Sequence, residues 1–149
     1  MITRPKINEG KSIQQLVNLY ASDGLLIPLS LHEVYERIRE FFVYKTDEQI
    51  VGVASLHVVW EDLAELRSMA VHPNYQCRGI GKALALRCIE EGRELCIKKV
   101  FLLTYKKEFF AKVGFQLVDK SELPQKVWSD CIKCVKFPDC DEIAMSLTL

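Results

Sequence analysis

The sequence predicts an α/β (α+β) fold in which a mixed central sheet is flanked by helices. Residues 12–41 contain two segments with apolar side chains at helical spacing. Residues 41–71 contain alternating, strand-like runs separated by polar turns. Residues 79–104 then place a helical pattern before an unbroken apolar run. This order of helices, an antiparallel meander and a βαβ unit indicates a sheet with helical layers packed on it.

The N-terminal part of the chain is predicted to form two helices. "SIQQLVNLY" and "LSLHEVYERIREF" both carry apolar residues three and four positions apart, which line one face of a helix. These residues are Ile13, Leu16, Val17 and Tyr20 in the first segment and Leu31, Val34, Tyr35 and Ile38 in the second. Ser30 directly precedes the second segment, where its hydroxyl suits an N-cap.

The middle of the chain is predicted to form the meander. In "FFVYKTDEQIVGVASLHVV", strand-like runs stand on both sides of "TDEQ", whose residues suit a hairpin turn. "AELRSMAV", residues 64–71, extends the alternation into a third strand. A regular alternation places Glu65, Arg67 and Met69 on the same face of the sheet.

The C-terminal half is predicted to complete the βαβ unit. Residues 79–97 form a long helix, and "VFLLT" fits a strand that is buried on both faces. "YKKEFFAKVGF" predicts a short helix that ends at Gly114, and "EIAMSLTL" predicts a terminal strand. Residues 120–141, between these two elements, are irregular and predict a long loop.

The composition predicts one domain, residues 1–149, and restricts its partners. With 49% hydrophobic residues the chain can bury one core. Twenty basic residues balance twenty acidic ones, so we expect no nucleic-acid partner. The apolar runs fall short of the roughly 20 residues that cross a membrane, and residues 1–10 lack the apolar centre of a signal peptide. We therefore expect a cytoplasmic protein without membrane contact. A homodimer is one option for its oligomeric state.

Five of the six cysteines form two groups, and the sixth, Cys77, lies in the bend of residues 70–84. A reducing cytoplasm favours thiols or metal ligands over disulfides. Cys88 and Cys96 lie on the helical pattern and are expected to be buried. Cys131, Cys134 and Cys140 cluster in "DCIKCVKFPDC". That spacing leaves open a zinc site without an obvious fourth ligand, or free thiols in a loop that covers the substrate.

The stretch "AVHPNYQCRGIGKAL", residues 70–84, has the features of a phosphate-binding turn. A strand ends at its start, and the chain enters a helix at residues 76–81. The first N–H groups of a helix have no internal partner and carry partial positive charge, so they bind phosphate readily. Gly79 and Gly81 leave room for the phosphate, and the cations Arg78 and Lys82 lie beside them. A lone Gly-x-Gly could equally serve close packing of a helix on a strand.

The string "LRSMAVHPNYQCRGIGKAL" resembles the acetyl-CoA signature Gln/Arg-x-x-Gly-x-Gly/Ala of the GNAT superfamily of N-acetyltransferases. The flanking strand and helix, "VFLLT" and "FFAKVGF" match that family as well. The resemblance implies the GNAT fold, with acetyl-CoA bound at the turn and a strand that splays from its neighbour to expose backbone groups. It assigns cofactor binding to Met69, Ala70, Val71, Gln76, Cys77, Arg78, Gly79, Ile80, Gly81 and Lys82.

A narrower resemblance concerns the substrate. "GLLIPLSLHEVYERIREFFVY", "AELRSMAVHPNYQCRGIGKAL", "VFLLTYKKEFFAKVGF" and "LPQKVWSDC" are similar to short, single-domain N-acetylglutamate synthases. This implies acetylation of the α-amine of a small amino acid, glutamate, in arginine biosynthesis. Leu29 stands where those enzymes commonly have an arginine, which leaves the exact amino acid open. The alternatives are a GNAT enzyme for another amine or a peptide, and a non-catalytic module that senses CoA.

The resemblance implies direct attack of an amine on the thioester, which requires a base and a group that binds the substrate. We expect Glu65 to be the base, with Glu61 in reserve. The reason is that the alternation places Glu65 on the face of Arg67 and Met69, near where the thioester should lie. Burial beside the cofactor would raise the pKa of its carboxyl group, whereas Arg67 would lower it. Arg67 is expected to bind a substrate carboxylate, with Lys126 as a helper. The alternative is that Glu65 and Arg67 form only a solvated ion pair on the strand.

The departing CoA thiolate also needs a partner. Many GNAT enzymes use a tyrosine at the second aromatic position of the helix after the buried strand, where this chain has Phe110. We expect Tyr105, or water, to replace that tyrosine, and Phe109 and Phe110 to lie in the core.

Overall fold

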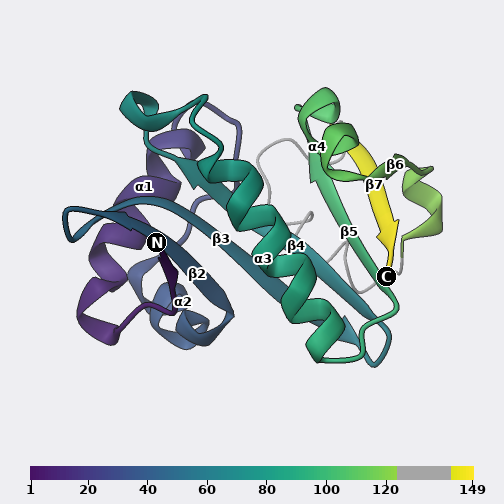
Figure 1. Ribbon diagram of the computed structural model, residues 1–149, viewed down its shortest axis with the longest axis horizontal. Helices are drawn as coiled ribbons and strands as arrows, with labels where there is room; N and C mark the ends of the chain where they lie inside the picture. Colours follow the sequence, from purple (N-terminus) through teal and green to yellow (C-terminus); the bar gives the residue numbers. More distant parts are fainter. Residues whose placement is uncertain (124–141) are drawn as a thin grey trace.

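The computed structural model of the chain describes residues 1–123 and 142–149. Its described strands form one sheet in the order β1-β2-β3-β4-β5-β7-β6 (Figure 1). The strands are β1 (Ile2–Thr3), β2 (Phe41–Thr46), β3 (Gln49–Trp60), β4 (Leu63–Val71), β5 (Lys99–Thr104), β6 (Gln116–Leu117) and β7 (Ile143–Thr148). The helices are α1 (Gly10–Ala21), α2 (Leu31–Glu36), α3 (Ile80–Glu94) and α4 (Lys107–Val113). Short 3₁₀ helices are η1 (Ile7–Glu9), η2 (Ile38–Glu40), η3 (Pro73–Tyr75) and η4 (Lys120–Glu122).

The sheet is mixed, as the sequence predicts. Strands β1 to β4 pair antiparallel, β5 lies parallel to β4, and β7 returns antiparallel to β5. Helix α3 connects β4 to β5 and lies along the sheet over β3 and β4, which completes the βαβ unit (Figure 1). The two-residue strands β1 and β6 were not predicted, because two residues carry no readable alternation.

The two N-terminal helices form as predicted, but the second is shorter. Ser30 caps α2: its hydroxyl accepts a hydrogen bond from the Glu33 N–H at 3.1 Å, and the Glu33 carboxylate accepts one from the Ser30 N–H at 3.3 Å. The helix ends at Glu36, and Arg37 leaves the helical region with φ −106°. The chain turns at that point because it must enter β2 at Phe41.

The hairpin predicted at "TDEQ" is confirmed. Thr46 at the end of β2 pairs with Gln49 at the start of β3, so the loop contains two residues. These residues, Asp47 and Glu48, both have positive φ, at 49° and 63°. Positive φ at both positions is what a two-residue loop needs to match the twist of its strands.

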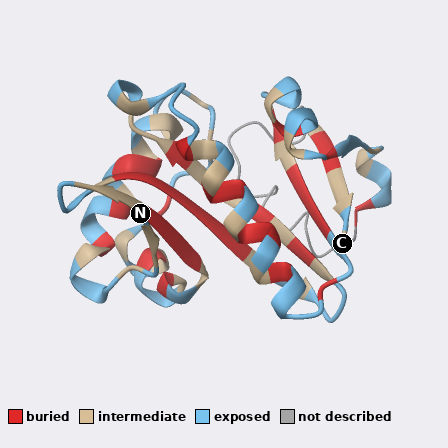
Figure 2. Ribbon diagram, viewed as in Figure 1, coloured by how far each residue is buried: buried red, intermediate tan, exposed pale blue. Residues whose placement is uncertain are grey.

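The core lies on both faces of the sheet. On one face α3 packs on the sheet, and the cluster there includes Leu56, Leu66 and Leu84. On the other face α1 and α2 pack on a second cluster that includes Val53 and Ala70. Figure 2 shows the buried residues running along β3 and β5 in the middle of the sheet.

Helix α3 is shorter than the predicted helix of residues 79–97. Gly79, with φ +82°, precedes the first helical residue, and the helix ends at Glu94. Cys96 follows in a left-handed conformation with φ +62° and is exposed, so the prediction that it is buried is wrong. The chain reverses at Cys96 to reach β5, which carries the thiol out of the core. Cys88 is buried as predicted, and burial raises the pKa of its thiol to about 12.

Four residues singled out in the sequence lie outside the described residues, namely Lys126, Cys131, Cys134 and Cys140. Within residues 1–123 and 142–149, no group of three His, Cys, Asp or Glu side chains is arranged to hold a metal. Across the same residues, the helices are too short or too polar to cross a membrane.

Candidate active site

The predicted phosphate-binding turn lies between β4 and α3. The His72 N–H donates to the Val51 carbonyl at 2.7 Å, which closes the last pairing with β3 before the chain passes through η3. Cys77 and Gly79 both have positive φ, at 61° and 82°. The helix therefore starts at Ile80, within the predicted entry at residues 76–81, and residues 76–79 form the turn that leads the chain to the N-terminus of α3.

The two glycines of the turn have different roles. Gly79 adopts a left-handed conformation, and a Cβ atom there would meet no atom within 4 Å. Glycine is therefore favoured at this position by the backbone conformation and not by a lack of space. Gly81 is helical, and a Cβ atom there would lie 3.3 Å from the Phe109 ring and 3.7 Å from Val71. Gly81 therefore keeps open the space between α3, α4 and β4.

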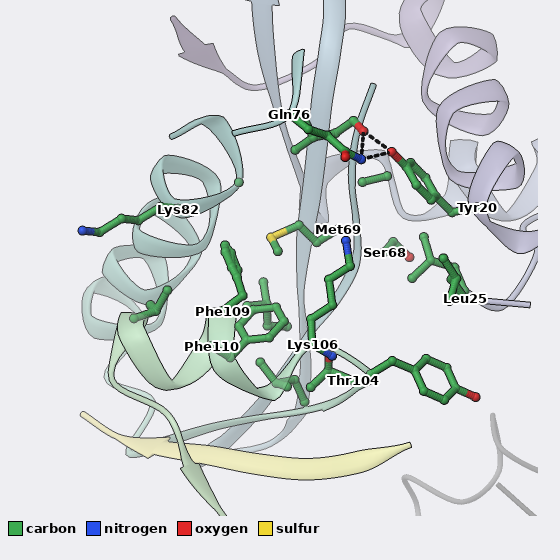
Figure 3. Close-up of a pocket in the computed structure, with 18 of the residues that line it drawn as sticks. Tyr20, Leu25, Ser68, Met69, Gln76, Lys82, Thr104, Lys106, Phe109 and Phe110 are labelled. Atoms are coloured by element: carbon green, nitrogen blue, oxygen red, sulfur yellow. Dashed lines mark hydrogen bonds between the residues drawn. The ribbon is translucent and has the colours of Figure 1, made fainter. Parts of the chain in front are cut away.

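The long polar side chains of the turn differ in what they contact. Gln76 donates through Nε2 to the Tyr20 hydroxyl oxygen at 2.5 Å and to the Val71 carbonyl at 3.4 Å, so its amide holds the turn against α1. The Arg78 guanidinium lies 5.1 Å from the centre of the Tyr75 ring and is exposed. Lys82 is exposed in the first turn of α3. Figure 3 shows its side chain extending outward from α3, away from the cavity.

Strands β4 and β5 separate beside this turn. Their parallel pairs run from Leu63–Lys99 to Glu65–Phe101, and no later pair joins them in the described chain. Both strands nevertheless continue, β4 to Val71 and β5 to Thr104. This confirms the splayed strand that the resemblance implies, and it leaves a gap between residues 66–71 and residues 102–104.

A β-bulge interrupts β4 at the gap. Arg67 pairs with Ser55 and Ala70 pairs with Val53, so Ser68 and Met69 together stand opposite one residue of β3. Ser68 has φ +55°. The extra residue reverses the alternation: Leu66 and Met69 pack on the α3 side, whereas Ala70 packs on the α1 side.

The bulge corrects one sequence prediction. Because the alternation is interrupted, Glu65 and Arg67 lie on the face that α1 and α2 cover, and Met69 lies on the opposite face with α3. The three side chains therefore do not share a face. Arg67 and Met69 still approach the same space, because the gap in the sheet connects the two faces.

The backbone of β4 presents its polar groups to the gap at alternate residues. His72 bonds to β3, so the N–H and C=O of Val71 point away from β3 and toward the gap. The Val71 carbonyl accepts hydrogen bonds there from the Tyr20 hydroxyl and from Gln76. The same alternation directs the Ala70 backbone toward β3.

A cavity of about 630 Å³ occupies this gap. It is bounded by the end of α1 and the following loop, by β4 and the turn, and by the end of β5 with α4 (Figure 3). The lining residues are Tyr20, Leu25, Leu26, residues 66–71, Tyr75, Gln76, Cys77, residues 79–82, residues 102–106, Phe109, Phe110, Lys112, Val113 and Glu142. Every predicted cofactor-binding residue except Arg78 is therefore at the cavity.

Tyr20 belongs to the site although the sequence indicated only a helix position for it. Its hydroxyl donates to the Val71 carbonyl and accepts from Gln76, which ties the end of α1 to the turn (Figure 3). Burial raises the pKa of this hydroxyl, the nearby charge of Asp23 acts in the same direction, and the Gln76 hydrogen bond opposes them. Tyr20 is thus a neutral donor at ordinary pH.

The predicted base and the predicted carboxylate-binding residue are neighbours. Arg67 Nη1 lies 3.5 Å from Glu65 Oε1, and 15% of each side chain is exposed. Arg67 lines the cavity, whereas Glu65 contacts Arg67 and is outside the described lining. The Ser55 hydroxyl donates to the Arg67 carbonyl at 2.9 Å, which holds the strand at the start of the bulge.

The end of β5 and the start of α4 form the opposite wall. Tyr105, the residue expected to replace the missing tyrosine, lines the cavity. Phe110 is buried in the core as predicted, but Phe109 is only half-buried and lies at the cavity against Gly81. Lys106 also lines the cavity, and the sequence had not singled it out.

Leu29 is a core residue. Only 6% of it is exposed, and it packs with Val34 and Ile38 on the α1 side of the sheet. The Asn18 side chain holds its backbone, accepting from the Leu29 N–H and donating to the Leu29 carbonyl, both at 3.0 Å. The leucine side chain is therefore directed into the core, and it is not part of the cavity lining in the described chain.

Comparison with known proteins identifies the family. The model of the acetyltransferase (GNAT) family matches residues 13–115. An uncharacterized N-acetyltransferase of Chlorobaculum tepidum is 33% identical over 148 residues, which cover 99% of this chain and 96% of that protein. An amino-acid acetyltransferase of Mycobacterium tuberculosis is 34% identical over 133 residues, covering 87% of this chain and 76% of that protein.

Two solved structures match this chain over its full length. The structure of Rv2747 from Mycobacterium tuberculosis, with CoA and a second ligand, is 31% identical with a TM-score of 0.86 and covers 100% of this chain and 99% of that one. N-acetylglutamate synthase from Neisseria gonorrhoeae, with coenzyme A and N-acetyl-glutamate, is 25% identical with a TM-score of 0.91. This chain is covered fully in that match and corresponds to 35% of the synthase chain. The chain belongs to the acetyltransferase (GNAT) family and is an acyltransferase that uses acetyl-CoA.

Proposed function

We propose that this protein transfers the acetyl group of acetyl-CoA to the α-amine of a small acidic amino acid, glutamate. The observation that carries the proposal is one cavity that passes through the gap between β4 and β5. The phosphate-binding turn and Met69 lie on the α3 side of the gap, and Arg67 lies on the α1 side. The two substrates can therefore approach from opposite faces of the sheet and meet at the bulge.

The residues of the turn fit the phosphates of acetyl-CoA. Gly81 leaves the first turn of α3 open, and the helix presents unpaired N–H groups beside Lys82. When it is bound, acetyl-CoA supplies the activated acetyl group. The backbone of β4 that faces the gap would hold the arm that carries this group, and a backbone N–H there would stabilise the oxyanion that forms during attack.

Arg67 provides the cation that an acidic amino acid requires. A guanidinium has five N–H donors, so Arg67 can contact Glu65 and still bind a substrate carboxylate through two parallel hydrogen bonds. The relatives support this substrate class, since one is named an amino-acid acetyltransferase and one structure holds N-acetyl-glutamate. The synthesis of N-acetylglutamate would place the protein in arginine biosynthesis.

Glu65 is the proposed general base, which takes the proton that the amine loses. It lies beside Arg67 on the face from which the amino acid would enter. Replacing Glu65 with glutamine keeps the shape of the side chain and removes its basicity. We expect kcat to fall by about a hundredfold or more, with little change in the affinity for acetyl-CoA. Steady-state kinetics over a range of pH would measure this. Glu108→Gln is the matched control, because Glu108 is exposed and outside the cavity lining in the described chain, and Glu61→Gln tests the reserve candidate separately. An unchanged kcat in E65Q would exclude Glu65 as the base.

A panel of acceptors tests the proposed function directly. The protein is incubated with acetyl-CoA and, in separate assays, with glutamate, aspartate, glutamine, neutral amino acids, a polyamine and a short peptide, and CoA release is followed. We expect the highest kcat/KM with glutamate. Rapid acetylation of the polyamine or peptide without turnover of the acidic amino acids would refute the glutamate proposal and leave the family assignment intact. Binding of acetyl-CoA without turnover of any acceptor would favour a CoA sensor.

A further inference from the structure

Lys106 lines the wall of the cavity opposite the bulge. It directly precedes α4, and its backbone N–H donates to the Thr104 hydroxyl at 2.9 Å. Thr104 is only 8% exposed, so this contact anchors the Lys106 backbone to the buried end of β5. This contact fixes the point from which the Lys106 side chain starts, at the rim of the gap.

The Lys106 side chain points into the cavity. Figure 3 shows it extending from the end of β5 toward the part of β4 that carries Ser68 and Met69. Its ammonium group makes no hydrogen bond or ion pair with the residues that the structure describes. A cation in this cavity, which apolar Met69 and Phe110 also line, is available for an anion that enters the gap.

The position of Lys106 along the gap indicates which anion that is. The phosphates of acetyl-CoA would sit at the turn beside Val71, so the arm that carries the acetyl group would extend away from the turn, along residues 71 to 67 of β4. The reacting end then lies at the bulge, where the Lys106 side chain arrives from the other wall. The amino-acid carboxylate has a separate cation in Arg67, on the α1 side of the sheet.

We propose that the Lys106 ammonium stabilises the CoA thiolate as it leaves. This inference rests on the proposed acetyl transfer but not on the identity of the amine. It also accounts for Phe110: a buried phenylalanine cannot protonate the thiolate, and Lys106 on the same wall supplies positive charge instead.

The bond changes define what Lys106 does. The amine nitrogen forms a bond to the acetyl carbon, the carbon–sulfur bond breaks, and its electron pair stays on sulfur. A thiolate is a weaker base than an amine, so a nearby ammonium group stabilises it by charge and not by giving up a proton. Lys106 therefore acts through its charge. The thiolate takes its proton from water when CoA is released.

The test measures the pKa of the thiol of bound CoA, without any acetyl acceptor. CoA labelled with ¹³C at the carbon next to the sulfur is bound to excess protein, and its chemical shift is followed by NMR from neutral to alkaline pH. Lys106→Met removes the charge and keeps the length of the side chain. We expect the pKa of the bound thiol to be lower by about 1 or more in the wild-type protein than in K106M. Lys106→Arg, which keeps a charge, should restore most of the difference.

Lys107→Met is the matched control, because Lys107 is exposed, adjacent, and outside the cavity lining in the described chain. It removes the same net charge and should leave the pKa of the bound thiol unchanged. In turnover assays K106M should lower kcat by roughly tenfold or more at an unchanged KM for the amine. Equal thiol pKa values in wild type and K106M, or a rise in the KM for the amine alone, would overturn the proposal. Failure of wild-type protein to bind CoA would instead refute the acetyl transfer itself.

Discussion

Replacing Gly81 with leucine should abolish acetyl-CoA binding while the protein stays folded. A Cβ atom at Gly81 would already lie 3.3 Å from the Phe109 ring, and the rest of a leucine side chain would extend into the space between α3, α4 and β4. That space is where the phosphates and the first part of the arm would lie. Isothermal titration calorimetry with acetyl-CoA should therefore detect no binding by G81L at concentrations that saturate the wild-type protein.

The fold should tolerate this change for two reasons. Gly81 lies within α3 at a helical φ, so a leucine there gains about 0.8–1.0 kcal/mol of helix propensity over glycine. Phe109 is half-buried at the cavity and can shift by the few tenths of an ångström that a Cβ atom requires. Gly79 is a less suitable target, because any side chain at φ +82° strains the backbone by about 1–2 kcal/mol.

Ala111→Leu provides the control for G81L. Ala111 is an exposed residue of α4 that does not line the cavity in the described chain, so the same enlargement there should leave binding intact. Thermal unfolding of both variants would show that each is folded. Undiminished affinity of folded G81L for acetyl-CoA would remove the turn from the cofactor site.

Replacing Arg67 with alanine should raise the KM for the amino acid strongly. Arg67 lines the cavity with 15% of its side chain exposed, so a carboxylate bound there would be largely removed from water. Loss of one partner of such a charge pair costs about 2–4 kcal/mol. That corresponds to a KM increase of roughly 30- to 900-fold. The KM for acetyl-CoA should change little, because the turn lies on the other side of the gap.

Two further variants make the Arg67 result specific. Arg93→Ala removes an exposed arginine near the end of α3, outside the cavity lining in the described chain, and should leave both KM values unchanged. Arg67→Lys keeps the charge but loses the paired N–H donors, so it should recover only part of the affinity. A parallel rise of both KM values in R67A would mean that the strand itself had moved, and an unchanged KM for the amino acid would refute the carboxylate contact.

Much of the fold was predictable from local patterns. The two N-terminal helices, the hairpin at Asp47 and Glu48 and the buried strand β5 each follow from the spacing of apolar residues and from turn residues. Where these predictions failed, the cause was tertiary. The second helix ends early because the chain must enter β2, and Cys96 is exposed because the chain reverses there to reach β5.

The sequence by itself predicted the anion-binding turn and the cation on the neighbouring strand. Gly79, Gly81 and the cations beside them predict an anion at the start of α3, and "VFLLT" predicts a strand beside β4. Each of these features depends on residues close together in the chain, so local conformational preferences and side-chain chemistry are enough to predict them. Arg67 could be named as a candidate for the same reason, because it is the cation of the strand "LAELRSMAV".

Only the tertiary structure decided how these groups meet. The bulge at Ser68 reverses the alternation of β4, so that Arg67 and Met69 lie on opposite faces, and the gap beside β5 joins those faces in one cavity. Tyr20 and Lys106 enter this cavity from segments that are far apart in the chain. A bulge and a gap arise from the pairing of distant strands, and one extra residue moves every later side chain to the other face. Local periodicity contains no information about that pairing, which is why the sequence named Arg67 and the turn but not Tyr20 or Lys106 as parts of the site.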